Sequence, residues 1–433
     1  MNGVYIYLCK EQIKCHIMKK NFKPESLMMS YGYKPELSEG AIKCPIFQTS
    51  TFVFQTAEEG KKFFELAYGL RQKEQGEELG LIYSRINNPN LEILENRLSL
   101  WDKADDSAVF ESGMSAISTV LLEFLKPGDL LLYSSPTYGG TDHFIHDFLP
   151  KIGVDSVAFH PENTQEEIEE IIKSTGKADR LGLIYIETPA NPTNSIIDIE
   201  MCCRIAAKHK NGEGKTYVCV DNTYMGPVWS KPLEIGADLV VYSATKFIGG
   251  HSDLIAGAVL GNAELMLRVK TLRTFLGNMV SPHTAWLMLR SLETLKIRME
   301  QQSRNAQKVA NFLNAHDKVE KVHYLGLIGK DSQYYELYKR QYNAPGAMIS
   351  FNIKGGEKEA FQFLNHLQLI QLAVSLGSTE SLAQHPQTMT HCAIDPKARE
   401  RMGVTASLVR ISIGVEDADD IIWDVEQALE QVK

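Results

Sequence analysis

The chain alternates between short apolar runs and longer amphipathic stretches over most of its length. Apolar residues at helical spacing predict helices at 91–100 and 115–125. Apolar runs typical of buried strands lie at 108–110, 129–134, 180–187, 216–221, 237–244 and 255–261. Strand-like runs that alternate with helices are typical of a mainly parallel sheet covered on both faces. The pattern therefore predicts an α/β fold.

The pattern changes after a long amphipathic stretch at 284–315. Beyond it, shorter strands mix with helices, with strands predicted at 318–326, 346–353 and 408–414 and helices at 357–367 and 418–431. Before residue 88 there is little continuous pattern, and 63–85 predicts an exposed helix and loop. We therefore predict three parts, an N-terminal arm at 1–87, a large α/β domain at 88–296 and a small C-terminal α+β domain at 297–433.

Five of the predicted strands are followed by small, polar or ionisable residues. These segments are Ser112-Gly113-Met114, Pro136 to Gly140, Glu187 to Pro192, Asp221-Asn222-Thr223 and Ser243 to Lys246. In open α/β sheets, ligands bind beyond the carboxyl ends of the strands. One such segment would be an ordinary loop. Five predict one crevice lined by a phosphate cradle, an aromatic ring, an amide, a carboxylate and an amine.

Lys246 has unusual neighbours for a lysine, which is usually a solvated surface residue. It follows an apolar run, adjoins the hydroxyls of Ser243 and Thr245, and precedes Gly249-Gly250. Hydroxyls beside an amine at a helix N-terminus favour a phosphate. Burial there would lower the pKa of the lysine and make it nucleophilic toward an aldehyde. Asp221, on the preceding strand, matches the carboxylate partner of the pyridinium nitrogen in pyridoxal phosphate (PLP).

Each of these signals has an ordinary explanation when it is taken alone. Ser112-Gly113 is first a helix-capping signal, and Asp221 is a common turn residue. Tyr138 is compatible with a half-buried ring. A dinucleotide-binding protein is disfavoured because no GxGxxG turn is present. A non-catalytic scaffold is disfavoured because both Lys246 and Asp221 are present.

Composition and charge narrow the class of protein. The 433 residues carry a formal charge of −9 and a pI of about 5.8, which argues against a nucleic-acid partner. We predict no membrane partner, because no apolar run reaches the about 18 residues of a bilayer span. The seven cysteines are scattered without CxxC spacing, which favours reduced thiols in the cytoplasm and predicts no metal site. Residues 1–17 resemble an extension upstream of a natural start at Met18.

Nine segments in order resemble the Cys/Met-metabolism family of PLP enzymes. They are YSRINNPN (83–90), ESGMSAI (111–117), YGGT (138–141), ETPANPT (187–193), VDNTY (220–224), YSATKFIGGHSD (242–253), SPH (281–283), SLGSTESLAQHPQTMTH (375–391) and LVRISIGVED (408–417). The resemblance covers the chain after about Tyr31. It implies an aspartate aminotransferase-type fold, with a mainly parallel central sheet and a smaller C-terminal α+β domain.

The resemblance implies a role for each matching residue. Lys246 resembles the Schiff-base lysine and proton shuttle, Asp221 the partner of the pyridine nitrogen, and Tyr138 the ring stacked on the cofactor. The implied phosphate and 3′-oxygen contacts are Gly113, Met114, Ser243, Thr245 and Asn191. For the substrate, Arg410 resembles the clamp on the α-carboxylate, helped by Ser375 and flanked by Val374.

Tyr83 and Arg85 resemble a pair that reaches the phosphate of a neighbouring subunit. The resemblance therefore implies active sites shared across a dimer, within a homotetramer made of two dimers.

The predicted reaction is carbon–sulfur bond cleavage in a small sulfur amino acid. Val374 favours methionine γ-lyase-like α,γ-elimination, which gives 2-oxobutyrate, ammonia and a thiol. Gly140 stands where methionine γ-lyases carry cysteine, and Arg273-Thr274 where they carry Lys-Asp, while the insertion at 69–80 is longer than expected. The alternative is a cystathionine γ-synthase or a cystathionine γ- or β-lyase. An O-acetylhomoserine sulfhydrylase ranks lower.

Overall fold

The computed structural model describes residues 22–67, 69–72, 74, 80–209, 211–212, 214–392, 394 and 396–433. The predicted upstream extension at 1–17 lies outside these residues, as do residues 73 and 75–79 of the 69–80 insertion. Within the described ranges, no helix is long and apolar enough to cross a membrane.

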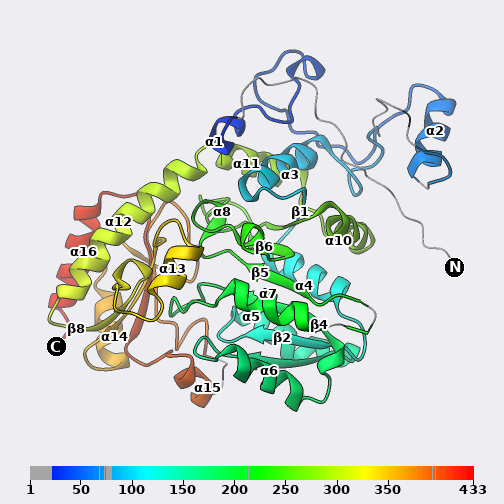
Figure 1. The fold of residues 1–433 in the computed structure, drawn as a ribbon. Helices are drawn as coiled ribbons and strands as arrows, with labels where there is room; N and C mark the ends of the chain where they lie inside the picture. Colours follow the sequence, from blue (N-terminus) through cyan, green and yellow to red (C-terminus); the bar gives the residue numbers. More distant parts are fainter. Residues whose placement is uncertain are drawn as a thin grey trace.

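A seven-stranded sheet forms the centre of the molecule (Figure 1). Its order is β1-β7-β6-β5-β4-β2-β3, with β1 (Asp106–Phe110), β2 (Leu130–Ser134), β3 (Asp155–Phe159), β4 (Leu181–Glu187), β5 (Tyr217–Asp221), β6 (Leu239–Ser243) and β7 (Gly257–Gly261). Only β7 runs antiparallel to its neighbours. The predicted mainly parallel sheet is confirmed. The carboxyl ends of β1, β2, β4, β5 and β6 therefore lie at one edge.

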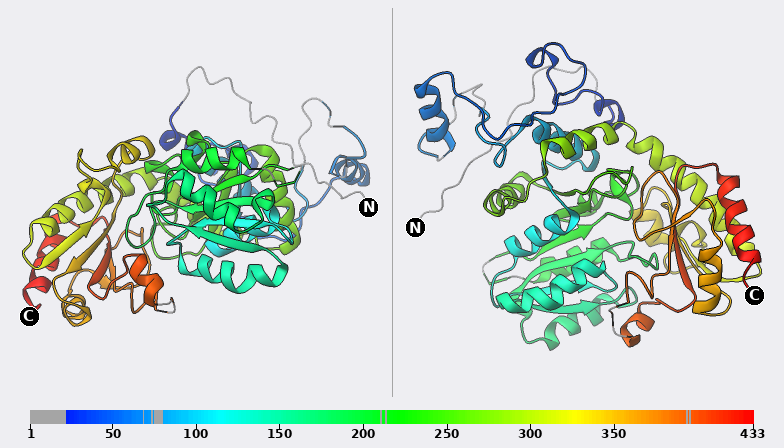
Figure 2. Two further views of the ribbon diagram at one scale, coloured as in Figure 1. Left: turned by 60° about the horizontal axis from the view of Figure 1, so that its bottom comes forward. Right: turned by 180° about the vertical axis from the view of Figure 1, so that it is seen from behind.

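Helices cover both faces of this sheet (Figures 1 and 2). Successive side chains of a strand point to opposite faces. Leu183 and Tyr185 of β4 thus join a core with α4 (Gly113–Phe124) and α10 (Ala263–Leu276). Ile184 and Ile186 join a second core with α6 (Gln165–Ser174) and α7 (Ile199–Lys208). Burial on both faces explains the nearly continuous apolar runs in the sequence.

A five-stranded sheet lies toward the C-terminus. Its order is β10 (Gln371–Leu372), β11 (Leu382–Gln384), β12 (Leu408–Ser412), β9 (Met348–Ile353) and β8 (Val319–His323). It packs with α12 (Leu295–Ala315), α14 (Glu357–Asn365) and α16 (Ala418–Glu430). The sheets and helices agree with the predicted α+β character of this part. The boundaries 1–87, 88–296 and 297–433 stay a prediction.

Helices in two segments have bounds that the sequence pattern does not mark. The amphipathic stretch at 284–315 forms two helices, α11 (Pro282–Leu292) and α12, with a break at Glu293 and Thr294. In the arm, the helix α2 (Ala57–Ala67) begins before the predicted 63–85 segment. It lies apart from the main body in Figure 1. The remaining long helix near the arm is α3 (Pro89–Asp102), which packs on β1 and α11.

Short helical segments fill the connections. They are α1 (Pro24–Leu27), η1 (Pro35–Leu37), α5 (Gly139–His143), η2 (Phe144–Phe148), η3 (Leu149–Ile152), η4 (Ala178–Arg180), α8 (Gly226–Trp229), α9 (Pro232–Ile235), η5 (Leu325–Leu327), α13 (Tyr335–Gln341) and α15 (Pro396–Arg401).

Candidate functional site

Lys246 lies just beyond β6, at the edge where the carboxyl ends of the strands meet. Its Nζ donates a hydrogen bond to Ser375 Oγ at 3.1 Å. Burial, and then the charge of Arg410, lower the pKa of Lys246 to about 8. Gly377 packs so closely that an added Cβ would lie 2.7 Å from Phe247 N. The segment 375–377 of the C-terminal part therefore closes over the lysine.

The start of α4 approaches the end of β6. Ser112 caps the helix by accepting a hydrogen bond from Ser115 N at 3.0 Å. A Cβ added to Gly113 would lie 2.8 Å from Ser243 Cβ, so glycine is what permits this approach. Thr245 Oγ1 accepts from Ala256 N at 3.0 Å, which fixes that hydroxyl beside the same edge. Backbone N–H groups at the start of α4 and nearby hydroxyls are therefore brought together, as a phosphate requires.

Asp221 is buried at the carboxyl end of β5. Its Oδ2 accepts a hydrogen bond from Tyr185 OH at 3.0 Å, and its Oδ1 accepts from Thr223 N at 3.0 Å. Burial raises the pKa of Asp221, and these hydrogen bonds oppose the rise. The carboxylate is thus held in one orientation at the carboxyl edge of the sheet, on the strand next to β6.

Arg410 is among the largest fully buried side chains, with 1 % of its surface exposed on β12. Its Nη1 donates to Asn191 Oδ1 at 2.9 Å, and its Nη2 donates to Ser375 O at 2.7 Å and to Val374 O at 3.3 Å. With its amide oriented to accept, Gln384 also lies 2.9 Å from Nη1. The guanidinium therefore joins the C-terminal segment to the loop after β4.

Tyr138 leaves the loop after β2 with 46 % of its surface exposed. A Cβ added to Gly140 would lie 2.7 Å from Tyr138 Cε1 and 3.1 Å from Met114 Sδ. The ring therefore lies near Met114, at the start of α4. Val374, next to Ser375, is 57 % exposed.

Tyr83 and Arg85 are the predicted site residues that contact a different part of the chain. Arg85 Nη1 donates to Thr274 O at 2.7 Å at the end of α10, and its guanidinium lies 5.7 Å from the centroid of the Tyr83 ring. Both side chains are exposed. The other predicted site residues form the set around Lys246. They lie at or just after the carboxyl ends of β1, β2, β4, β5 and β6, at 374–375 and on β12.

Arg273, which the sequence suggested as a departure bearing on the substrate, is buried elsewhere. Its Nη1 pairs with Glu95 at 2.6 Å and donates to Val109 O at 2.9 Å. Its side chain therefore ties α10 to α3 and β1.

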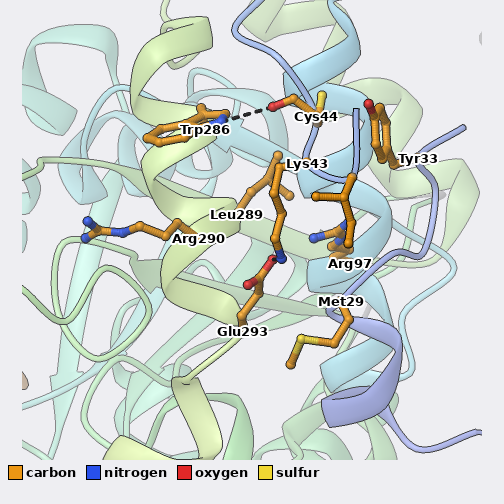
Figure 3. A pocket seen from close by; sticks show the side chains of 10 residues that line it. Met29, Tyr33, Lys43, Cys44, Arg97, Trp286, Leu289, Arg290 and Glu293 are labelled. Carbon is orange, nitrogen blue, oxygen red and sulfur yellow. Dashed lines mark hydrogen bonds and ion pairs between the residues drawn. The ribbon is translucent and has the colours of Figure 1, made fainter. Parts of the chain in front are cut away.

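Two cavities lie outside the set around Lys246. One of about 90 Å³ lies between the arm and helices α3 and α11, where Trp286 Nε1 donates to Cys44 O at 3.0 Å and Lys43 pairs with Glu293 at 2.5 Å (Figure 3). The other, of about 480 Å³, is lined by Ser135, Pro136 and residues 193–196 together with residues near β8. Lys246 lines neither. Among the described residues, no cluster of His, Cys, Asp or Glu suits a metal ion.

These features fit PLP. The close approach of Gly113 to Ser243 leaves backbone donors for a phosphate, the buried Asp221 suits a pyridinium nitrogen, and the amine of Lys246 with its lowered pKa suits an aldehyde. The family model for Cys/Met metabolism PLP-dependent enzymes matches residues 25–430. The chain belongs to this family. Its members are PLP-dependent enzymes.

Individual members of the family match almost the whole chain. L-Methionine γ-lyase of Fusobacterium nucleatum is 41 % identical over 395 residues, covering 91 % of this chain and 94 % of that protein. Cystathionine γ-lyase of Bacillus subtilis is 36 % identical over 411 residues, covering 95 % of this chain and all of that protein. The crystal structure of cystathionine γ-synthase from Xanthomonas oryzae matches with a TM-score of 0.84 and 31 % identity, covering 95 % and 99 % of the two chains. These matches confirm the predicted family and fold class.

Sequence reasoning missed several residues that shape the site. Tyr185 donates a hydrogen bond to Asp221, and Gln384 accepts from Arg410. Glu187 entered the sequence analysis only as the residue at the end of a predicted strand. A polar residue inside an apolar run was the available signal for Tyr185 and Glu187. Nothing in the local sequence marks Gln384, because its contact with Arg410 depends on how β11 pairs with β12.

Proposed function

We propose that the protein is a PLP-dependent carbon–sulfur lyase that acts on sulfur amino acids by methionine γ-lyase-like α,γ-elimination. Methionine and water would give 2-oxobutyrate, ammonia and a thiol. The observation that carries the proposal is the 41 % identity to L-methionine γ-lyases of Fusobacterium nucleatum and Porphyromonas gingivalis, over more than nine-tenths of each chain.

The residues around Lys246 have matching roles in this proposal. The start of α4, with Gly113 and Met114, binds the phosphate together with the hydroxyls of Ser243 and Thr245. Asp221 keeps the pyridine nitrogen protonated, Tyr138 stacks on the ring and Asn191 binds the 3′-oxygen. When bound, PLP withdraws electrons from the α-carbon of the amino acid.

Lys246 is the residue that would hold the cofactor and move protons. Its Nζ, with a pKa lowered to about 8, is neutral in a large enough fraction at neutral pH to accept the proton from the α-carbon. Arg410 orients the substrate by binding its α-carboxylate with a planar, fully buried guanidinium. Ser375 holds both groups, through its hydroxyl on Lys246 and its carbonyl on Arg410.

A few side chains bear on the choice of substrate. Val374 is exposed beside Ser375, and an apolar residue there suits a methyl thioether better than the distal ammonium and carboxylate of cystathionine. Gly140 supports the alternative, because glycine stands where methionine γ-lyases carry cysteine and resembles the cystathionine enzymes at this position. A cysteine Cβ there would lie 2.7 Å from Tyr138 Cε1. Cystathionine γ-lyase, γ-synthase or β-lyase activity is therefore the second candidate, and O-acetylhomoserine sulfhydrylase ranks lower.

The assembly is part of the proposal. Tyr83 and Arg85 are exposed and lie against each other, with Arg85 bound to the end of α10, as expected of side chains that reach the phosphate in a second copy. A dimer would then be the smallest active unit, and two dimers would form a homotetramer. A cytoplasmic location is proposed from the scattered cysteines, of which the five within the described residues are free.

A side-by-side assay tests this function. The purified protein should be yellow, and 2-oxoacid and thiol release should be measured with methionine, cystathionine, cysteine and homocysteine. We expect the highest kcat/KM for 2-oxobutyrate formation with methionine. Turnover of cystathionine without turnover of methionine would replace the first candidate with the second, and a protein that binds no PLP would overturn both.

A further inference from the structure

Glu187 is a buried carboxyl group at the end of β4 for which the proposed function has no role. Its Oε2 accepts hydrogen bonds from Tyr138 N at 2.7 Å and from Thr137 Oγ1 at 3.3 Å. Its Oε1 accepts from Asn191 N at 3.0 Å. One carboxylate therefore binds the backbone of two residues proposed to touch the cofactor. They lie in different loops, one after β2 and one after β4.

Glu187 also lies beside Asp221. The two residues are paired in register where β4 runs parallel to β5, and both are buried. Neighbouring strands in a sheet are about 4.8 Å apart. Burial, and then the charge of Asp221, raise the pKa of Glu187 to about 8. The hydrogen bonds from Tyr138 N and Asn191 N oppose this rise, and they use both oxygens as acceptors.

Burying a carboxyl group costs free energy unless its hydrogen bonds offset the cost, and both of its oxygens can accept hydrogen bonds whether or not it carries a proton. Glutamine would fit the same space, but its amide has a single acceptor oxygen. One of the two backbone N–H groups would then face another donor. The two backbone N–H groups therefore require two acceptor oxygens in fixed positions. A side chain that only filled the space would not supply them.

We propose that Glu187 is a positioning residue, whose carboxyl group fixes the loop of Tyr138 and the loop of Asn191 relative to Asp221. This inference rests on the proposed function. Glu187 acts through Tyr138 and Asn191, so its loss should change how the cofactor is held and how fast the reaction runs. The binding of the substrate carboxylate by Arg410 should change less.

The test compares Glu187→Gln with a matched control, Asp424→Asn. Asp424 is a buried carboxylate on α16, within the C-terminal part. It accepts hydrogen bonds from the backbone N–H groups of Gln368, Leu369 and Ile370. Both substitutions remove a buried acceptor of backbone N–H groups. Only Glu187 adjoins the set around Lys246.

Four quantities are measured on the full-length proteins: thermal unfolding, PLP affinity of the PLP-free protein, visible circular dichroism of bound PLP, and kcat with KM for methionine. For Glu187→Gln we expect about tenfold weaker PLP binding, a changed visible dichroic band, and a kcat reduced at least about tenfold with KM within about twofold. Asp424→Asn should lower the unfolding temperature and leave the other three quantities near those of the wild type.

Glu187→Asp provides the answer if Glu187→Gln does not fold. It keeps the charge but withdraws the carboxylate by one methylene, so it should shift the same quantities in the same direction by a smaller factor. Wild-type PLP affinity, dichroism and kcat in the folded Glu187 variant, or changes no larger than those of Asp424→Asn, would overturn the inference. A wild-type protein that binds no PLP would instead overturn the proposed function.

Discussion

Two groups of predicted site residues differ in how the fold treats them. Lys246, Asp221, Asn191 and Arg410 are buried or partly buried and joined by hydrogen bonds from several elements. Tyr83 and Arg85 are exposed and lie against each other, and Arg85 binds the end of α10. The first group can be arranged by a single chain, because parallel strands bring their carboxyl ends to one edge. The second group could bind a cofactor only if a second copy of the chain placed its own site next to Tyr83 and Arg85.

Because of this difference, substitutions in the two groups should affect the stability of the protein differently. Buried groups such as Arg410 are hydrogen-bonded within the chain. Their loss should leave polar partners unsatisfied and so lower stability as well as activity. Exposed groups such as Arg85 should be replaceable with little effect on stability. The following predictions are ordered from the largest expected effect to the smallest.

Lys246→Ala should give the largest loss. Without the amine, borohydride should no longer fix PLP to the protein, and turnover should fall by about 10²–10⁴-fold from lost proton transfer alone. Mass spectrometry after borohydride treatment and a 2-oxoacid assay measure the two effects. Lys308→Ala, on the exposed face of α12, is the control and should behave as wild type. Covalent PLP on the Lys246→Ala protein would show that another residue holds the cofactor.

Arg410→Lys should weaken substrate binding more than cofactor binding. A lysine keeps the charge but not the planar fork, so KM for methionine should rise by about tenfold to a hundredfold. Steady-state kinetics and a PLP titration separate the two effects. Arg304→Lys, on an exposed position of α12, should leave KM unchanged. An unaltered KM in Arg410→Lys would contradict the assignment of the carboxylate site.

Arg85→Ala should weaken PLP binding by about tenfold, as expected for the loss of a charged hydrogen-bond donor to a phosphate. Its unfolding temperature should stay near that of the wild type, because the side chain is exposed. Equilibrium titration of the PLP-free protein measures the affinity. Arg204→Ala, exposed on α7, is the control. Equal PLP affinity in Arg85→Ala and the wild type would show that Arg85 of the arm does not contribute to PLP binding.

The pH dependence of cofactor capture should report on Lys246. Only the neutral amine attacks an aldehyde, and a pKa lowered to about 8 means that most Nζ atoms are protonated below pH 8 and neutral above it. The rate at which PLP-free protein binds PLP should therefore increase by about tenfold between pH 7 and pH 9. Stopped-flow absorbance measures this rate. A midpoint near the ordinary lysine pKa would contradict the buried environment of Lys246.

Much of the fold could be predicted from the sequence, because strands buried on both faces give apolar runs. The strand β3 was missed because most of its positions are partly exposed at the edge of the sheet. The break between α11 and α12 at Glu293 and Thr294 could not be predicted, because the amphipathic pattern continues through it.

The site could be predicted where its residues follow strands. The carboxyl edge explains why Ser243, Lys246 and Asp221 were found together. Arg273 stood out because Arg273-Thr274 replace the Lys-Asp of methionine γ-lyases, and its burial against Glu95 could not be predicted from that departure. The role of Glu187 could not be predicted, since it depends on hydrogen bonds to Tyr138 and Asn191 that only the folded loops bring within reach.

Mixing Arg85→Ala with Lys246→Ala protein tests most directly whether one working site needs two copies of the chain. Each variant alone should have little activity at limiting PLP. After subunit exchange, some hybrid sites would combine an intact Lys246 from one copy with an intact Arg85 from the other, so activity should recover to about a quarter of that of wild-type sites if exchange is random. No recovery after exchange has been demonstrated by mass-tagged subunits would contradict the shared site and place Tyr83 and Arg85 outside it.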